Sequence, residues 1–504
     1  MRRWGDGRLR SSLPLAVGVA AAIAGAVGWA EATRGGPRST ARVTGVYSPR
    51  APAETRAEAE AALEQDAILR EERFLEAVQP GRAFASTRVG EAEIEAGRWS
   101  AGELFALGAQ LFHLTFTREV GLGARDLPPL ARFHTGRRGG PDAFRCDACH
   151  WRGGPAGAGD AADDAYLDGD GNAQSTTLGR NPIALAGAGL VEILAAEMNA
   201  ELQASRAALR ARARWKGPAR GELRAKGVSF GQVTVRPDGT LDDRELAGVD
   251  ADLVIKPFGW KGNMPTLRDA VEDALLIHHG MESVHLVKTA PRERIGPFGG
   301  ADPDGDGVAR EIEEGQVTAL TLFVALQEIP QVTTPADANM IVLMAEGRTQ
   351  FATLGCAACH VPSLPLSSTV FRLPSREGGR GLAYDLAAVG AEPRVAPEAQ
   401  GASGARVYLY SDLKRHDLGP GLAEPRADRG VEGKMFLTRP LWGVARSRPY
   451  LHDGRAATLE DAILLHGGEA QEARDAYARL KDSERAPVRV FLTSLTRAKR
   501  LVVR

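Results

Sequence analysis

The chain has 504 residues, including 63 basic and 64 acidic side chains, so its formal net charge is close to zero. A balanced charge provides no overall field that would attract nucleic acid, and no nucleic-acid partner is expected. The length exceeds that of one small module and predicts a multidomain protein.

The N-terminus has the order of segments that is typical of an export signal. A basic stretch at 1–10 precedes an uncharged run rich in Ala, Gly and Val at 11–30, and the small residues Ala30 and Ala32 mark its end. We expect a signal peptide at 1–32. A run of this length can also span a bilayer, so an uncleaved N-terminal anchor is the alternative. In both cases the remaining chain is expected in the periplasm or otherwise outside the cytoplasm, with a membrane contact only if the segment is retained.

The four cysteines form two copies of one pattern, CDACH at 146–150 and CAACH at 356–360, and none remains for a disulfide. Covalent haem attachment needs two thiols separated by two residues, which bond to the vinyl groups, and a histidine directly after them, which reaches the iron. Zinc binding and a thioredoxin-like redox pair are the alternatives, but both motifs end in His and neither lies in a strand–helix pattern. The sequence therefore predicts two haem c groups. Their predicted attachment residues and proximal iron ligands are Cys146, Cys149, His150, Cys356, Cys359 and His360.

The chain repeats itself around these motifs. Apolar residues recur at spacings of three and four over 100–117 and 336–354, which predicts an amphipathic helix upstream of each motif. Small c-type cytochromes place a packing helix there. We expect a mainly α fold with long loops and two cytochrome domains in tandem, at 97–332 and 333–504.

Two regions lack the pattern of a packed core. Much of 33–96 is rich in Ala, Arg and Glu with few large apolar residues, and it predicts a linker and an exposed helix. Residues 199–256 have no counterpart in the second half. They are expected to be an insertion with a basic helix whose charges face solvent.

Residues 302–313 match the calcium-loop pattern D-x-D-x-D-G-x-x-x-x-x-E at every position. Carboxylates at alternate positions, a Gly at the turn and a distant Glu suit a hard cation that prefers oxygen ligands. The predicted Ca²⁺ ligands are Asp302, Asp304, Asp306 and Glu313. A solvated acidic turn is the alternative.

Two stretches at 260–270 and 452–462 align without a gap, and each begins a helix after a Thr N-cap. Both helices run into histidine: His466 in the second copy, and His278 with His279 in the first. In this register the two histidines lie one helical turn beyond the place of His466, about 5.4 Å along the axis. Either one of them ligates the first iron at rest, or both lie too far away and leave that iron open to an oxidant.

The C-terminal half contains three stretches in a characteristic order: PLWG from Pro440, YLHDGR from Tyr450 and HGGEA from His466. Together with the two haem motifs they resemble the di-haem peroxidase superfamily, which includes the bacterial cytochrome c peroxidases. Within it, they resemble most the di-haem oxidoreductases. The resemblance covers about residues 100–500 and depends on the order of motifs, not on C-x-x-C-H alone.

In the peroxidases that the chain resembles, the N-terminal haem carries out the chemistry and the C-terminal haem relays electrons. A Trp lies between the haems and a calcium ion lies at the domain boundary, and Trp260 and the loop 302–313 fall at matching positions. The relay haem often has a distal Met where this chain has His466, so the resemblance implies that His360 and His466 hold the second iron. A buried histidine without iron is the alternative for His466. Axial His gives a lower potential than Met.

Glu192 follows an apolar stretch at 183–191, where an acid is unexpected unless it is exposed or in a pocket. Such a carboxyl could transfer protons while an oxygen–oxygen bond is cleaved, or its role could be structural. The candidate catalytic residues are Glu192, Trp260, His278 and His279.

These features predict an exported, peroxidase-like di-haem c-type oxidoreductase. Its expected partners are a small oxidant, hydrogen peroxide or dioxygen, and a periplasmic electron donor. The peroxidases often place Gln in the distal pocket near the position of Ala270, so dioxygen stays open as the oxidant. An oxygenase that acts on an organic substrate and a pure electron-transfer cytochrome are the alternatives.

Overall fold

The computed structural model describes residues 88–116, 143–154, 156–167, 177–289, 310–327, 334–386 and 405–496, with the backbone of short strands at 133–134, 137–138 and 396–397. The predicted signal or anchor segment at 1–32 and most of the predicted linker at 33–96 lie outside these ranges. Three of the four predicted calcium ligands, Asp302, Asp304 and Asp306, also lie outside them. Within the described part of the chain, no helix is long and apolar enough to cross a membrane.

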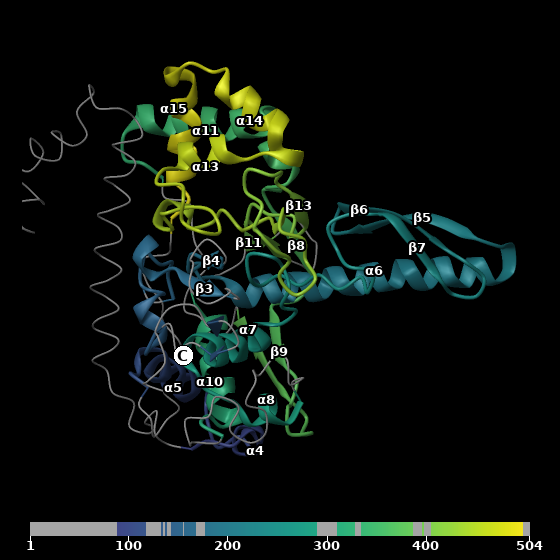
Figure 1. Cartoon of the computed structure of the whole chain (residues 1–504), viewed down its shortest axis with the longest axis vertical. Coiled ribbons are helices and arrows are strands. Elements are labelled where there is room, and N and C mark those ends of the chain that lie inside the picture. The colour runs from purple at the N-terminus through teal and green to yellow at the C-terminus, as the bar shows by residue number, and fades with distance from the viewer. Residues whose placement is uncertain are drawn as a thin grey trace, which may run out of the picture.

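The fold is mixed, with 42% helix and 18% strand, so the prediction of a mainly α fold is wrong. The long loops that the sequence predicts contain short antiparallel strand pairs, several of which lie between two groups of helices, whereas β9 lies beside the lower group (Figure 1). The paired strands are β1 (Phe133–His134) with β2 (Arg137–Arg138), β3 (Ala165–Leu167) with β4 (Leu178–Arg180), β9 (Val370–Leu373) with β10 (Leu382–Asp385), and β13 (Arg415–Asp417) with β14 (Met435–Leu437). A further sheet has the order β11 (Ala396–Pro397), β12 (Ala405–Val407) and β8 (Leu364–Leu366).

The first group of helices packs around the pair α5 and α10. The α5 helix, predicted at 100–117, runs over Ala101–His113 and starts with a capping box between Ser100 and Glu103. It approaches α10 so closely that a side chain at Gly108 would collide with the main-chain oxygen of Ala319. The group consists of α4 (Glu91–Glu95), α5, α7 (Leu267–Ala274), α8 (Val284–Thr289) and α10 (Glu314–Ala325).

The second group packs around α11 and α15. The α11 helix, predicted at 336–354, runs over Ala338–Thr353, and its Gly347 lies directly against the main-chain oxygen of Pro487. The group consists of α11, α13 (Leu459–Leu465), α14 (Gln471–Ala478) and α15 (Asp482–Thr493). Each haem motif therefore follows the first helix of one close pair and precedes the second. The division into domains at 332 and 333 stays a prediction.

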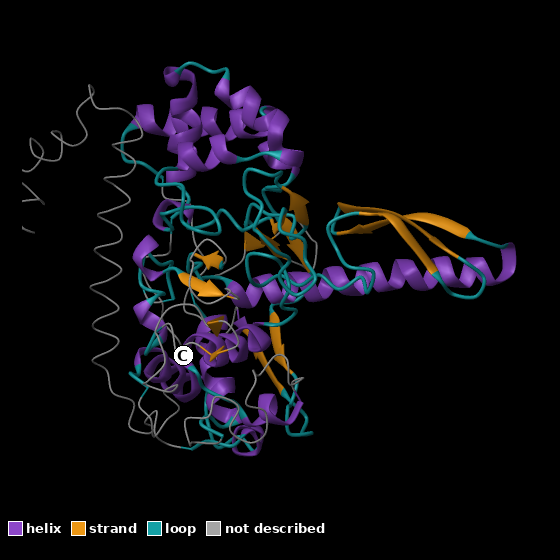
Figure 2. Ribbon diagram, in the orientation of Figure 1, coloured by secondary structure: helices purple, strands orange, loops and turns teal. Residues whose placement is uncertain are grey.

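The predicted insertion forms an arm that projects from the molecule (Figure 1, Figure 2). The 29-residue helix α6 (Ala188–Lys216) is its spine, and a three-stranded antiparallel sheet lies along it in the order β5-β6-β7. Alternate residues such as Leu223 and Phe230 are buried against the helix. The insertion thus holds a sheet as well as the expected basic helix. The strands are β5 (Ala219–Ala225), β6 (Val228–Val235) and β7 (Leu241–Leu246).

The base of the arm is attached to strand β13. The main-chain N–H of Arg415 donates to the oxygen of Gly248 at 3.1 Å, and the Arg415 guanidinium forms an ion pair with Asp250. Asn199 on α6 accepts from the N–H of Ile255 at 2.7 Å, which closes the arm at its root. The arm is therefore joined by hydrogen bonds to the part of the fold that holds the second haem motif.

Candidate functional site

The first haem motif lies on the wall of a cavity in the N-terminal half. The 3-10 turn η2 (Cys146–Ala148) and the residues after it place Cys146, Cys149 and His150 on that wall, and the cavity volume is about 590 Å³. Most other lining side chains are apolar, which suits a porphyrin. They include Phe112, Phe258, Met264, Leu267, Val271, Leu275, Leu320 and Val324.

The ring of His150 is held from its Nδ1 side. Nδ1 lies 3.0 Å from the main-chain oxygen of Ile183 and 3.2 Å from that of Gly157. Because carbonyl oxygens only accept, Nδ1 carries the proton and Nε2 keeps its lone pair. Burial of the ring lowers its pKa to about 4, so the ring is neutral at pH 7. A neutral imidazole oriented in this way is the form that ligates iron.

The second haem motif has the same arrangement in the C-terminal half. The turn η6 (Cys356–Ala358) precedes Cys359 and His360, and these residues line a cavity with a volume of about 330 Å³. The Nδ1 of His360 lies 3.1 Å from the main-chain oxygen of Tyr410 and therefore donates to it. Burial, together with the nearby His466, lowers the pKa of His360 to about 4. Nε2 of His360 is thus left for iron.

The loop that supplies the Tyr410 oxygen has an unusual backbone. Tyr410 has φ 55° and Leu413 has φ 56°, the left-handed region that non-glycine residues seldom adopt. Such a conformation costs on the order of 1–3 kcal/mol per residue and persists only where the surroundings impose it. The loop 410–413 is therefore held in one shape by its packing, and that shape orients His360.

His466 lies in the same cavity as His360. It directly follows α13, where the chain leaves the helical conformation, and its Nδ1 donates to the oxygen of Ala462 at 2.7 Å. Burial lowers its pKa, which favours the neutral ring. The structure therefore brings together the two histidines that the sequence pairs on the second iron.

The structure separates the two histidines of the first repeat. They end a π-helical turn, η5 (Leu275–His279), which inserts one extra residue into the helical turn after α7. Both histidines line the N-terminal cavity, but they differ in their contacts, and His278 lowers the pKa of His150 by its charge. His279 lies with Nε2 3.5 Å from the Cys146 sulfur and Nδ1 3.0 Å from the oxygen of Ala143. His278 is thus the one that resembles His466 in its placement, and His279 lies against the haem-attachment sulfur.

The two cavities share a wall. The indole of Trp260 lines both, and its Nε1 donates to the main-chain oxygen of Asn181 at 2.8 Å. Trp260 therefore lies between the two predicted haem positions, where the resemblance places a bridging Trp. The residues that face both cavities are Asn181, Pro182, Ile183, Leu185, Phe258 and Trp260.

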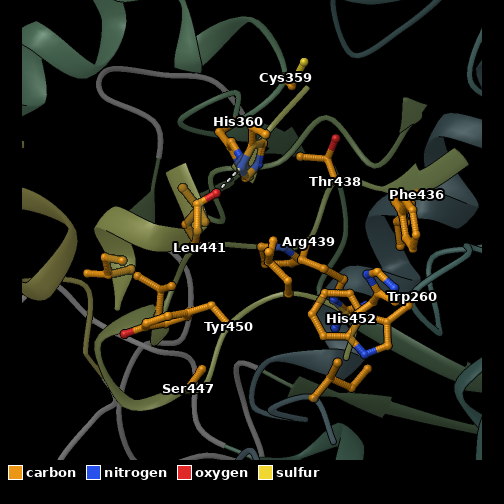
Figure 3. Close-up of a pocket in the computed structure, with 18 of the residues that line it drawn as sticks. Trp260, Cys359, His360, Phe436, Thr438, Arg439, Leu441, Ser447, Tyr450 and His452 are labelled. Carbon is orange, nitrogen blue, oxygen red and sulfur yellow. Dashed lines mark hydrogen bonds between the residues drawn. The ribbon is translucent and has the colours of Figure 1, made fainter. Parts of the chain in front are cut away.

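A guanidinium lies beside this wall. In Figure 3, Arg439 lies between His360 and Trp260, and its guanidinium carbon is 5.9 Å from the centre of the Trp260 ring system. Burial lowers the pKa of Arg439 to about 10. Its guanidinium forms a long hydrogen bond, at 3.5 Å, with the main-chain oxygen of Gly259. Arg439 is therefore well placed to pair with a propionate of a haem in the C-terminal cavity.

A buried ion cluster supports the wall from behind. Lys261, next to Trp260, is fully buried, and its Nζ lies 3.1 Å from the Glu424 carboxylate and 3.7 Å from the centre of the Phe436 ring. Glu424 also forms an ion pair with Arg180, which precedes Asn181. Burial lowers the pKa of Lys261 while Glu424 opposes that change. The charges are paired, so the cluster fixes the position of Trp260.

His416 lies at the edge of the C-terminal cavity between two carboxylates. Its Nε2 is 2.8 Å from Asp412 Oδ2, its Nδ1 is 2.7 Å from Glu469 Oε2, and Nδ1 is also 3.8 Å from the Cys359 sulfur. Burial of the ring opposes its charge, but the Asp412 carboxylate raises its pKa. The sequence marks Glu469 only as a member of the HGGEA stretch, and 412–416 is not helical, so neither position predicts this contact.

Glu192 does not lie on the wall of either cavity within the described residues. Its Oε2 accepts from the N–H of Leu267, the first residue of α7, at 2.5 Å, and burial raises its pKa to about 7. The carboxyl therefore supports the start of the helix that leads to His278. It is not brought to the place where an oxidant would bind.

Glu313, the one described member of the predicted calcium loop, precedes α10 as its N-cap. Its carboxylate lies 3.4 Å from the Arg88 guanidinium. Its main-chain N–H donates to Gln316 at 3.0 Å.

The residues of both cavities fit haem c. In each cavity two cysteines and a neutral histidine with an available Nε2 share a wall that is otherwise largely apolar. The features that sequence reasoning missed are the main-chain oxygens of Tyr410, Ile183 and Asn181, together with Arg439 and Glu469. Main-chain acceptors leave no trace in residue identity, so no motif could have identified the three oxygens.

Comparison with protein families agrees with this geometry. Residues 330–495, about a third of the chain, match the family model described as "Di-haem oxidoreductase, putative peroxidase". The match confirms the resemblance for the part of the chain that carries His360, Trp442 and His466. It supports an oxidoreductase with two haems.

Two solved structures are similar to the chain at low levels. Hydrazine synthase of Kuenenia stuttgartiensis has 14% identity and a TM-score of 0.34, over 83% of this chain and 98% of that chain. A MauG-like protein associated with microbial copper homeostasis has 15% identity and a TM-score of 0.27, over 53% of this chain and 79% of that chain. Neither score is high enough to define the arrangement of this molecule. No curated protein matches the chain.

Proposed function

We propose that the protein is an exported di-haem c-type oxidoreductase of the peroxidase type. It takes electrons from a periplasmic donor and reduces hydrogen peroxide or dioxygen. The observation that carries the proposal is the shared wall, because Trp260 faces a haem motif on each side. An electron carrier with two independent haems has no need of such a wall, whereas an enzyme that delivers electrons from one haem to another does.

The two haems have different tasks in this proposal. The haem in the N-terminal cavity, held by His150, supplies the chemistry of oxidant binding and reduction. The haem in the C-terminal cavity is closed by His360 and His466 and supplies electrons. Trp260 connects the two cavities.

The protein residues control access and position. His150 and His360 are fixed by main-chain acceptors, so each keeps its Nε2 directed at its cavity. His278 lines the same cavity as His150 and would control whether an oxidant can reach a haem held there. The apolar wall excludes water from the reaction.

The placement of His278 favours a second candidate, a pure electron-transfer cytochrome. If His278 stays on the iron under all conditions, both haems are closed and no oxidant binds. The two candidates therefore differ in one observable property, an iron position that can be opened.

Ca²⁺ binding by Asp302, Asp304, Asp306 and Glu313 is part of the proposal, on the strength of the complete loop pattern. The ion would steady the two haem domains against each other. Metal analysis of the purified protein before and after exhaustive chelation tests this point. Unchanged calcium content and unchanged inter-haem electron transfer would contradict it.

The deciding experiment is a cyanide and peroxide titration of the oxidised and the half-reduced protein, followed by absorption and electron paramagnetic resonance spectra. A haemochrome assay first establishes two haems per chain. We expect one haem to bind the ligand in the half-reduced protein while the other stays low-spin. If neither haem responds in either state, the enzyme proposal fails and electron transfer remains. Turnover that depends on peroxide then indicates a peroxidase, and turnover that depends on dioxygen indicates an oxygenase.

A further inference from the structure

We propose that Asp412, His416 and Glu469 form a fixed charge triad that sets the reduction potential of the C-terminal haem and positions its Cys359 thioether. This inference rests on the proposed haem attachment at Cys359 and goes beyond it. His416 and its partners belong to none of the haem motifs, and they contribute no ligand to the iron.

The hydrogen bonds determine the charge of every member. Asp412 Oδ1 accepts from the N–H of Lys414 at 3.0 Å and Oδ2 faces the His416 ring at 2.8 Å. Glu469 Oε1 accepts from the N–H of Asp417 at 3.0 Å and Oε2 faces the ring at 2.7 Å. One oxygen of each carboxylate accepts from a main-chain N–H and the other faces a ring nitrogen, an arrangement that an ionised carboxylate satisfies with both of its oxygens.

The ring must then be a cation. Each ring nitrogen of His416 faces a carboxylate oxygen that can only accept, so both nitrogens carry protons. The ring is 9% exposed and Asp412 is 2% exposed, so this pair is hardly screened by solvent, whereas Glu469 is 53% exposed. The triad as a whole carries one negative charge, with its positive member between the two negative ones.

The positive member also lies close to the haem-attachment residue Cys359. Nδ1 of His416 lies 3.8 Å from the Cys359 sulfur, and both His416 and Glu469 line the C-terminal cavity. A thioether sulfur is a weak acceptor, so the Nδ1–H can be shared between Glu469 and the sulfur. The ring therefore positions the thioether edge of the haem.

The charges act on reduction with opposite signs. Reduction adds an electron to the haem, so a cation beside its edge favours reduction and an anion disfavours it. The positive charge of His416 thus offsets part of the effect that the two carboxylates have on the reduction potential. A change that removes one charge without moving the others should shift the potential in the direction of that charge.

The test is a spectroelectrochemical titration of the intact di-haem protein and of two variants. Glu469→Gln keeps an acceptor for His416 and removes one negative charge, so it should favour reduction of the C-terminal haem. His416→Gln removes the cation and should disfavour reduction, measured near pH 8 so that the carboxylates stay ionised. Each shift is expected to be on the order of tenfold in the reduction equilibrium, which is 59 mV for one electron.

The matched control is Glu472→Gln. Glu472 is an exposed carboxylate three residues along the chain, in the first turn of α14, and its replacement should leave the potential unchanged. His416→Lys restores a cation and should return the potential toward that of the unaltered protein. If Glu469→Gln and His416→Gln shift the potential in the same direction, or no further than Glu472→Gln, the inference is overturned.

The same samples separate this inference from the proposed function. Loss of the C-terminal haem, or of its low-spin spectrum, in the unaltered protein would refute the haem assignment itself. A normal low-spin spectrum with unmoved potentials in the variants would refute only the triad. Should His416→Gln fail to fold, Glu469→Gln still decides, because Glu469 is half exposed and its replacement is nearly isosteric.

Discussion

Trp260 and Asn181 are joined by a hydrogen bond of 2.8 Å, from the indole Nε1 to the main-chain oxygen, and both residues face both cavities. The partition between the two haem sites is therefore one layer of residues thick at this point. An aromatic ring at such a position shortens the distance that an electron must cross outside a conjugated system.

Replacement of Trp260 should slow electron transfer between the haems. Trp260→Phe keeps an aromatic ring but loses the indole N–H, so the Asn181 oxygen loses its donor at a cost of about 1 kcal/mol in stability. We expect the inter-haem rate to fall by about tenfold or more while both haem spectra stay unchanged. Rapid-mixing spectroscopy of the half-reduced protein measures the rate. Trp442→Phe is the control, because Trp442 lines the C-terminal cavity only, and an equal effect of both replacements would contradict a bridging role.

The two distal histidines should differ in how firmly they close their irons. His466→Gly removes the distal ligand of the C-terminal haem, so its low-spin signal should become high-spin and the supply of electrons should fall. His278→Gly should produce the corresponding change in the N-terminal haem and increase its affinity for cyanide. Electron paramagnetic resonance of the oxidised variants reports both changes, and both variants should retain two haems. His285→Gly, in α8, should alter neither spectrum. A His466 variant that stays fully low-spin would show that another residue ligates that iron.

Lys261 should contribute strongly to folding stability. Lys261→Met leaves Glu424 buried without one of its two cations, and removal of one partner from a buried ion pair costs about 3–5 kcal/mol. Urea unfolding followed by circular dichroism measures the loss. Lys434→Met is the control: its 2.8 Å ion pair with Asp417 is largely exposed, and such pairs contribute about 0–1 kcal/mol. Similar losses in the two variants would mean that the Lys261 cluster is no more important than a surface pair.

Glu192 should make stability depend on pH. The pKa of its carboxyl group is about 7 in the folded protein, whereas the ordinary value is 4.5. Between pH 4.5 and pH 7 the folded state therefore binds more protons than the unfolded state. Stability should therefore fall as pH rises through this range. Glu192→Gln keeps an acceptor for Leu267 and should lose less stability between pH 5 and pH 8, seen as a difference of a few degrees in Tm. Glu201→Gln on the same helix is the control, since that side chain is 45% exposed. If the Glu192 variant follows the pH profile of the unaltered protein, the carboxyl does not titrate in this range.

The sequence predicts the iron chemistry better than the architecture. His150, His360 and His466 follow from motif spacing and repeat alignment, because these residues must supply particular atoms. The roles of His278 and His279 could not be divided in advance, since that division depends on the π-helical turn at 275–279. No residue pattern distinguishes such a turn from a regular helix.

The prediction of a mainly α fold failed for a related reason. The helices at 101–113 and 338–353 have apolar spacing that is visible in the sequence, whereas the strand pairs are two to four residues long outside the arm. Strands of that length show no alternation over a useful window. In the arm, the charged stretch around 219–246 conceals a sheet that has only one buried face.

The attachment of the arm to strand β13 limits how the protein can be trimmed. A deletion over 199–256 would remove Gly248 and Asp250, the two partners of Arg415, and would loosen the residue that precedes His416. A shortened protein intended for crystallisation should therefore keep both roots of the arm, including Asn199 and 247–256, and rejoin the chain further out. In a protein shortened in that way, the haem pocket retains its support, and the projecting part of the arm can be exchanged as a separate module.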